Sequence, residues 1–573
     1  MVHGPTAVAA GAVQLVRNVQ EAINHFLRKV EPMYLVMFSI CGTIVYIRVR
    51  RVLRQSDRPL LERLKGTIFS IARRTAIMQR RLEVGILKTR KELVKTIHKC
   101  DKERTFICEL PSFGYDVEKI LAIARKYKDM CEIEVNKGRV SGALYTNENE
   151  KHKKLLNQIF DMYCYSNPLH PEVFPGCRKM EAEVVRIVSD IYHGGSDCCG
   201  TMTTGGTESI MLAMLAYRNK AYAEGNNDPE MLVPVTAHAA FDKASQLFGM
   251  RIRHIPVGVG NAVDVKAMAK AISSSTCALV ASAPCFPSGT IDNVSEISRL
   301  GLYYNIPVHV DACLGGFLIP FMDEAGYPLP LFDFRLPGVT SISCDTHKYG
   351  YAPKGSSVIL YRDVKYLHYQ YFCIPEWTGG LYVTPTFAGS RCGSSIALTW
   401  ATLLLYGREG YVERTKAIIK CAREIADGIR GTTKMPGIKG LELFGSPDLS
   451  VVAFTSHVCN IYAIADKMGT LGWNLNTLQN PPAIHICVTL STAYAGAAQD
   501  FLRDLRVVTE MVMNEPSKGN DSATASIYGL AAAIPDKSLV SEISMEFLDA
   551  CYATPAANYE EDLEHKLNVL QST

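Results

Sequence analysis

Short apolar runs alternate with amphipathic stretches along most of the chain beyond residue 111. Continuous apolar runs bounded by turn-forming residues predict buried strands. These runs lie at 231–235, 277–283, 307–310, 341–344 and 356–361. Helical spacing occurs between them, at 240–248 and 294–304. The alternation is typical of βαβ units and predicts an α/β fold with a mostly parallel central sheet, over residues 111–400.

The pattern changes beyond residue 401. A long helical stretch at 403–429 is followed by short strands near Leu441 and Val451 and at 485–490. This order predicts a smaller C-terminal α+β domain over residues 401–514, followed by a tail over 515–573.

One apolar run near the N-terminus lies outside this pattern. Residues 33–47 carry no charge, and the run extended to 30–49 gives about 30 Å of helix, enough for a hydrocarbon core. A signal peptide and a buried core helix are the alternatives. A signal peptide starts nearer the terminus and ends in small residues, and a core helix has polar positions on one face. The run therefore favours a single-span membrane anchor at 30–49.

Basic residues orient this predicted anchor. Five arginines lie between positions 48 and 58, whereas only Arg28 and Lys29 closely precede the run. The positive-inside rule then puts residues 1–29 on the lumenal side and the large C-terminal part in the cytosol. Residues 48–100 contain 16 Lys/Arg against 4 Asp/Glu. We interpret residues 50–110 as a basic helical stalk, solvated rather than lying on an anionic membrane surface.

Composition narrows the function classes. The chain is 47% hydrophobic and 21% charged, as in ordinary folded proteins, and its net charge of +4 is too small to suggest nucleic-acid binding. The 18 cysteines form no CxxC pair and no His/Cys cluster at zinc spacing. We expect reduced thiols and no metal site.

Candidate chemistry lies where predicted strands end, since ligands of open α/β sheets bind at the carboxyl ends of the strands. The sequence TTGGTES at 203–209 precedes an apolar helix. Its glycines allow backbone N–H groups to approach an anion, and the helix N-terminus adds a positive dipole. This predicts a phosphate cradle, although a Gly-Gly pair is often only a turn.

Three further residues follow predicted strands. His238 is either a packed loop residue or a catalytic one, and Asp311 either caps a helix or holds a proton on a heterocyclic nitrogen. Lys348 is either a solvated lysine or the partner of an aldehyde, once positive charge and burial lower its pKa from about 10.4. A phosphate cradle followed by His, Asp and Lys is the arrangement that pyridoxal 5'-phosphate (PLP) requires.

Three segments carry a resemblance to a known family: VHVDACLGGF at 308–317, SISCDTHKYGYAPKGSS at 341–357 and GSR at 389–391. They resemble the sphingosine-1-phosphate lyases, in the group II decarboxylase branch of fold-type I PLP enzymes. The similarity runs from about residue 111 to SIYGLAAAIPD at 526–536, and the predicted anchor and stalk also resemble eukaryotic members. Departures are small: the family often has serine at Thr204 and alanine at Cys344, and Cys392 is unusual.

The resemblance implies an aspartate-aminotransferase-like fold (fold type I) with PLP as cofactor. Lys348 would form the covalent link, Asp311 would pair with the pyridine nitrogen, and His238 would stack on the ring. The other implied cofactor contacts are Gly206, Thr207, His347, Asn167 and, from a second subunit, Ser390. The implied contacts to a substrate phosphate are Tyr145, His170 and Lys354.

The implied function is retro-aldol cleavage of a phosphorylated sphingoid base to a long-chain aldehyde and phosphoethanolamine, the terminal step of sphingolipid degradation. The resemblance also implies a homodimer in the endoplasmic reticulum membrane. One alternative is a PLP-dependent amino-acid decarboxylase, which shares the cradle, His, Asp and Lys. Another is a catalytically inactive membrane scaffold, against which the intact residue set argues. Lys348, a tyrosine and a phosphate oxygen all remain candidates for the C3-hydroxyl base.

Overall fold

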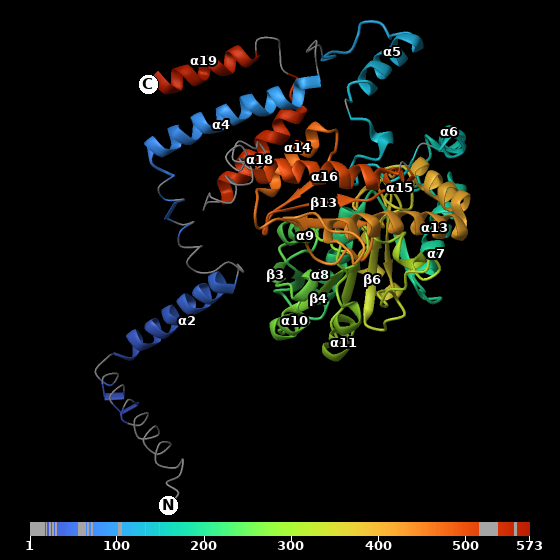
Figure 1. Ribbon diagram of the computed structural model, residues 1–573. Helices are drawn as coiled ribbons and strands as arrows, with labels where there is room; N and C mark the ends of the chain where they lie inside the picture. The colour runs from blue at the N-terminus through green and yellow to red at the C-terminus, as the bar shows by residue number, and fades with distance from the viewer. Residues whose placement is uncertain are drawn as a thin grey trace, which may run out of the picture. The chain divides into compact units, whose positions relative to one another are not determined.

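The computed structural model describes residues 31–54, 73–100, 106–131, 133–147, 149–494, 496–514, 537–554 and 559–572, with isolated residues between 18 and 71. The chain divides into two compact units, residues 1–59 and 60–573. The motif at 526–536 and most of the predicted lumenal segment 1–29 lie outside the described residues. Figure 1 shows the elements of the chain.

A seven-stranded sheet forms the centre of the larger unit. In spatial order its strands are β1 (Cys199–Thr203), β7 (Ser357–Tyr361), β6 (Val339–Cys344), β5 (Val308–Asp311), β4 (Thr276–Ser282), β2 (Glu230–Pro234) and β3 (Arg251–Ile255). Neighbours from β6 to β3 pair in parallel, whereas β7 is antiparallel to both β6 and β1. The predicted mostly parallel sheet is confirmed, and the five predicted strands lie within two residues of the observed ones.

Helices cover both faces of this sheet. They are α7 (Pro175–Ile191), α8 (Gly206–Ala223), α9 (Ala240–Phe248), α10 (Val265–Ala271), α11 (Val294–Tyr304), α12 (Val364–His368) and α13 (Gly393–Arg430). Successive residues of β4 belong to two different core clusters, one with α8 and α9 and the other with α7, α11 and α13. Both faces are therefore buried, which explains why the strands read as continuous apolar runs.

A second, antiparallel sheet follows α13. Its strands, in the order β10 (Glu442–Leu443), β11 (Val451–Thr455), β13 (Ala483–Cys487) and β12 (Asn476–Leu478), accompany α14 (Ile461–Thr470), α15 (Leu490–Tyr494) and α16 (Ala497–Asn514). Helix α13 begins ten residues before the predicted position 403 and contains a break at Gly407, where φ is 57°. It runs through the predicted boundary between residues 400 and 401, so the domain limits stay a prediction.

The remaining elements of the larger unit are short or lie toward the ends of the chain. They are α4 (Ala76–Ile97), α5 (Val117–Lys128), α6 (Glu150–Tyr163), the hairpin β8 (Phe372–Ile374) and β9 (Tyr382–Thr384), α18 (Lys537–Tyr552), α19 (Tyr559–Ser572) and the 3-10 turns His98–Cys100, Val135–Lys137, Val259–Asn261 and Ile319–Phe321. All 18 cysteines are free thiols.

The predicted stalk is not simply solvated. Its helix α4 packs against α18 and α19 from the opposite end of the chain, burying Val94 (Figure 1). Arg90 forms an ion pair with Glu546, and Lys91 Nζ lies 2.9 Å from Glu564 Oε2. Two basic residues of α4 thus have acidic partners in the C-terminal helices, which corrects the interpretation of this helix as fully solvated.

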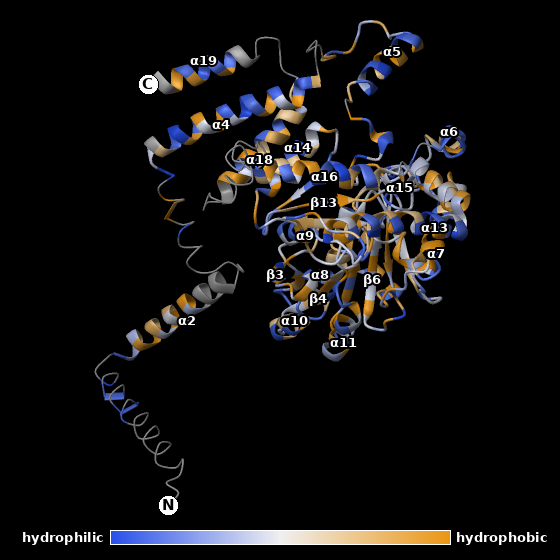
Figure 2. Cartoon of the chain, viewed as in Figure 1, coloured by the Kyte–Doolittle hydropathy of each residue, from blue (hydrophilic) through white to orange (hydrophobic). Residues whose placement is uncertain are grey.

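In the smaller unit, α2 (Pro32–Arg54) carries many exposed apolar side chains, including those of Met33, Phe38 and Tyr46 (Figure 2). Within the described residues, no helix combines the length and the hydropathy needed to cross a membrane. The anchor at 30–49 is therefore not confirmed and stays a prediction.

Candidate active site

The cradle lies between β1 and α8, as predicted. The Glu208 carboxylate accepts hydrogen bonds from Thr204 N and Oγ1, both at 2.7 Å, and so fixes the turn. Helix α8 begins at Gly206, and a Cβ atom there would lie 2.7 Å from Cys313 Sγ and 2.8 Å from Asp345 Oδ1. The helix N-terminus therefore approaches neighbouring groups more closely than any side chain would allow.

Gly206→Ala is expected to lower the free energy of unfolding by about 1–3 kcal/mol, the usual cost of an extra methyl group in a packed site. Gly205→Ala is the matched control. Its Cβ would meet only His347 Cε1, at 3.5 Å, and its φ of 166° is an ordinary extended conformation. Urea denaturation without added cofactor measures both variants, and equal stabilities would contradict the packing argument.

A cavity of about 390 Å³ opens beside the cradle. It is lined by Thr204, Gly205, Gly206, Thr207, Glu208, Ile210, His238, Cys313, Asp345, His347 and Lys348. Backbone N–H groups fix the orientation of two histidine rings in the cavity wall. His238 Nδ1 accepts from Ala240 N at 3.1 Å, and His347 Nδ1 accepts from Ser356 N at 3.2 Å. Five of the predicted site residues thus share one cavity.

Asp311 lies at the carboxyl end of β5, as predicted, but is not among the residues that line the cavity. Its Oδ1 accepts from Cys313 N at 3.0 Å and from Ser343 Oγ at 3.4 Å. Cys313 does line the cavity, so Asp311 lies directly behind the wall. The carboxylate is buried, and its hydrogen bonds fix its position.

Sequence reasoning missed Asp345. Its carboxylate is 2% exposed, with Oδ2 2.9 Å from Lys348 Nζ and 3.5 Å from His347 Nε2. Among the described residues, Oδ1 has no hydrogen-bond partner. The sequence did contain a signal for it. An aspartate three positions before a lysine can meet that lysine when the chain makes one turn between them.

The environment of Lys348 corrects one expectation. Burial is the largest single effect and disfavours the ammonium group, but the charge and hydrogen bond of Asp345, together with Cys313 and Tyr145, raise the pKa of Lys348 above its usual value. The expectation that surrounding positive charge and burial lower this pKa is therefore wrong for the cofactor-free chain. In the cofactor-free chain the Lys348 amine is therefore positively charged at neutral pH.

Two of the three residues predicted near a substrate phosphate lie close to Lys348. Lys354 Nζ is 4.8 Å from the centroid of the Tyr145 ring, and the charge of Lys348 acts on both residues. Burial, followed by the positive charge of Lys348, lowers the pKa of Lys354. Burial raises the pKa of Tyr145 above its usual value, so its phenol stays protonated at neutral pH.

The third, His170, does not line the cavity. Its side chain is 56% exposed, and Nδ1 lies 3.6 Å from Glu172 Oε1. Asn167, in the same loop, donates from Nδ2 to Ser390 Oγ at 3.1 Å, and its Oδ1 accepts from Arg391 N at 3.2 Å. This loop and the GSR segment therefore contact each other within one chain.

The residues present fit PLP. An amine, a glycine-lined helix N-terminus and a buried carboxylate oxygen without a partner converge on one cavity. Gly206 and Thr207 can bind the phosphate, and Lys348 can bind the aldehyde carbon. Among the described residues, no group of three His, Cys, Asp or Glu side chains is arranged to hold a metal ion.

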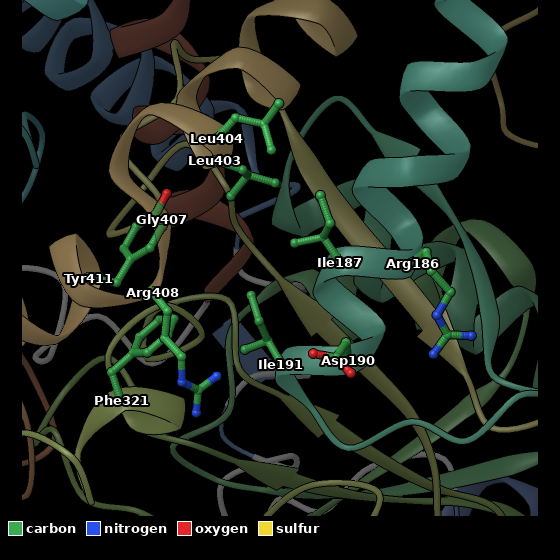
Figure 3. Close-up of a pocket in the computed structure, with 10 residues that line it drawn as sticks. All are labelled: Arg186, Ile187, Asp190, Ile191, Phe321, Leu403, Leu404, Gly407, Arg408 and Tyr411. Carbon is green, nitrogen blue, oxygen red and sulfur yellow. The ribbon is translucent and has the colours of Figure 1, made fainter.

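A second cavity, of about 530 Å³, lies between α7 and α13 (Figure 3). Ile187 and Ile191 of α7 and Leu403 and Leu404 of α13 contribute apolar side chains to its wall. It shares no lining residue with the cavity at Lys348.

Fold and site together define the class of PLP-dependent decarboxylases and lyases, and the family described as "Pyridoxal-dependent decarboxylase conserved domain" matches residues 123–455. Sphingosine-1-phosphate lyase 1 of Mus musculus is 44% identical over 533 residues, which cover 93% of this chain and 92% of the relative. The Drosophila melanogaster sphingosine-1-phosphate lyase is 42% identical, covering 94% and 98%. The chain therefore belongs to the sphingosine-1-phosphate lyase family.

Solved structures agree with this assignment. A Burkholderia pseudomallei sphingosine-1-phosphate lyase superposes with a TM-score of 0.68 at 38% identity, covering 72% of this chain and 94% of the other. A Lactobacillus brevis glutamate decarboxylase superposes with a TM-score of 0.60 over 73% and 98% of the two chains. At 21% identity, that likeness shows the fold alone.

Proposed function

We propose that this chain cleaves phosphorylated sphingoid bases between C2 and C3, giving a long-chain aldehyde and phosphoethanolamine. The observation that carries the proposal is the Lys348 amine, which lines one cavity together with the anion cradle at the carboxyl edge of the sheet. Membership of the sphingosine-1-phosphate lyase family supports the choice of substrate.

Each residue near the cavity has a role in this reaction. PLP, when bound, supplies an electron-accepting ring. Gly206 and Thr207 would bind its phosphate through backbone N–H groups, and His238 would cover the ring. Lys348 would hold the cofactor through its amine, which a substrate amine can displace. Asp311, from behind the wall, would keep a proton on the ring nitrogen and so strengthen its electron demand.

The second half of the site binds the substrate. The ammonium of Lys354 attracts the substrate phosphate, and the protonated phenol of Tyr145 donates a hydrogen bond to it. The proton of the C3 hydroxyl leaves to a base, the C2–C3 bond breaks, and a proton returns to C2. Lys348, a tyrosine and a phosphate oxygen remain the candidates for that base.

The direct test incubates the detergent-solubilised, PLP-loaded chain with a phosphorylated sphingoid base and measures the aldehyde released. We expect aldehyde and phosphoethanolamine in equal amounts, and much less from the unphosphorylated base. Glutamate and an aromatic amino acid test the decarboxylase alternative. Release of carbon dioxide from either amino acid, without cleavage of the sphingoid base, would contradict the proposal and support the decarboxylase alternative.

We also propose that residues 30–49 anchor the chain in the endoplasmic reticulum membrane with its catalytic part in the cytosol. The exposed apolar side chains of α2 and the arginines at 48–58 support this placement. A lipid substrate and an apolar product make a membrane location useful. Alkaline extraction of microsomes, with protease protection of the two ends of the chain, tests it. Extraction into the soluble fraction would contradict the anchor.

A homodimer is the proposed assembly, with Ser390 reaching the site of the second subunit. The support is fold-level similarity to other PLP enzymes. Light scattering of the detergent-solubilised full chain measures the protein mass. An active monomer would contradict the dimer.

A further inference from the structure

The loop that follows β6 pairs the attachment lysine with a carboxylate of its own. Lys348 N lies 3.4 Å from Asp345 O, and the side chains of these residues meet with Nζ 2.9 Å from Oδ2. The carboxylate is 2% exposed, so water contributes little to its solvation. The Lys348 side chain is 23% exposed, so the pair is screened less than one on the surface without being fully removed from water.

Both oxygens of this carboxylate lie close to the anion cradle. A Cβ atom on Gly206 would be 2.8 Å from Asp345 Oδ1 and 2.9 Å from Oδ2, and among the described residues Oδ1 has no hydrogen-bond partner. The carboxylate therefore lies against the N-terminus of α8, where a phosphate is expected to bind. The Asp345 side chain thus lies beside both the Lys348 amine and the anion cradle.

Other titratable groups around Lys348 cannot supply the negative charge. Cys313, which follows β5, and Tyr145, in the loop before α6, both act on the Lys348 amine. Burial raises the pKa of both groups, so they are neutral near pH 7. Lys354 is cationic, and His347 carries no negative charge in either of its states. Asp345 is left as the counter-ion.

We propose that Asp345 is a positioning residue that docks the amine of Lys348 in its charged form whenever this amine is not bound to the cofactor. This inference rests on the proposed function, because it assigns a resting position to the lysine that the substrate amine displaces. An ammonium has no electron pair for attack on an aldehyde, so docking holds the lysine in place and unreactive until it loses a proton.

A chemical probe tests the docking without any lyase turnover. Pyridoxal, which lacks the phosphate, is added to the cofactor-free full chain with cyanoborohydride. The neutral amine adds to the aldehyde, water leaves, and hydride reduces the carbon–nitrogen double bond to a stable secondary amine. Peptide mapping then gives the labelling rate at Lys348 across about pH 7 to 12, a range that extends above the ordinary lysine pKa of about 10.4.

Asp345→Asn removes the charge and keeps the shape. We expect its labelling profile to move to lower pH by at least about one unit, because the ammonium loses its counter-ion. Asp345→Glu retains the charge and is expected to stay close to the wild-type profile. Asp292→Asn is the matched control, since Asp292 is a buried carboxylate outside the cavity that accepts from Ser282 N and Val263 N.

A folded Asp345→Asn chain with the wild-type profile would overturn the proposal, as would an equal shift in Asp292→Asn. If Asp345→Asn does not fold, Asp345→Ser provides the same comparison. A chain without lyase activity that still shows the Asp345→Asn shift would reject the proposed function and keep the docking role. An active lyase in which Asp345→Asn leaves the labelling profile unchanged would support the proposed function and reject the docking role.

Discussion

Lys348→Arg is expected to abolish turnover of a phosphorylated sphingoid base, by roughly 10⁴-fold or more, the scale seen when a covalently acting residue is removed. Arginine keeps a positive charge that can still pair with Asp345. Its guanidinium stays protonated in proteins, so it cannot form the carbon–nitrogen link to an aldehyde. The variant therefore separates the chemical role of the lysine from its charge.

Spectroscopy and activity should change together. The wild-type holoprotein is expected to show the visible absorption of a linked PLP, and borohydride should fix the cofactor on the peptide that contains Lys348. The Lys348→Arg chain should show neither. Lys365→Arg is the matched control, because Lys365 does not line the cavity, is 64% exposed, and has its Nζ 3.4 Å from Asp363 Oδ2 and 5.3 Å from the centroid of the Tyr366 ring. A variant at Lys348 that retained turnover would remove the basis of the proposed function.

The central strands could be predicted because both faces of the sheet are buried. In β4 all seven residues are buried and each is apolar or small, which gives a continuous run in the sequence. Strand β1 (CGTMT) was missed because it contains two threonines and a glycine. Its hydroxyls have partners outside the strand: Thr203 Oγ1 lies 2.7 Å from Ser209 Oγ, and Thr201 Oγ1 accepts from Gln370.

Long-range pairing explains the other differences from the sequence-based expectations. The basic side chains of α4 look solvated until α18 and α19, more than 400 positions later, supply Glu546 and Glu564. Asp345 reads as one polar residue in a loop, and its importance depends on Gly206 and Cys313 meeting it in space. The cradle was found from its glycines before an apolar helix, and His238 and Lys348 were found because each follows a predicted strand; the carboxyl ends of parallel strands lie at one edge of the sheet.

Asp311→Asn is expected to leave PLP bound and to lower kcat by about 10²–10³-fold, the usual cost of removing one preorganised electrostatic contact to the reacting group. Asparagine is nearly isosteric and its carbonyl oxygen can still accept from Cys313 N, so the fold and the cavity wall are kept. The amide lacks the charge that stabilises a proton on the ring nitrogen. Cofactor content, the absorption spectrum and steady-state kinetics measure the three effects separately.

The comparison with Asp345 makes this prediction decisive. Asp311 lies behind the cavity wall, whereas Asp345 lines the cavity, so position alone does not assign the partner of the ring nitrogen. The ion pair with Lys348 favours Asp311: a carboxylate beside the lysine amine would lie near the aldehyde carbon that this amine binds, and the ring nitrogen of PLP is on the opposite side of the ring from that aldehyde. We therefore expect Asp311→Asn to impair kcat with an unchanged labelling profile at Lys348, and Asp345→Asn to move that profile. Full kcat in Asp311→Asn would show that the ring nitrogen has another partner.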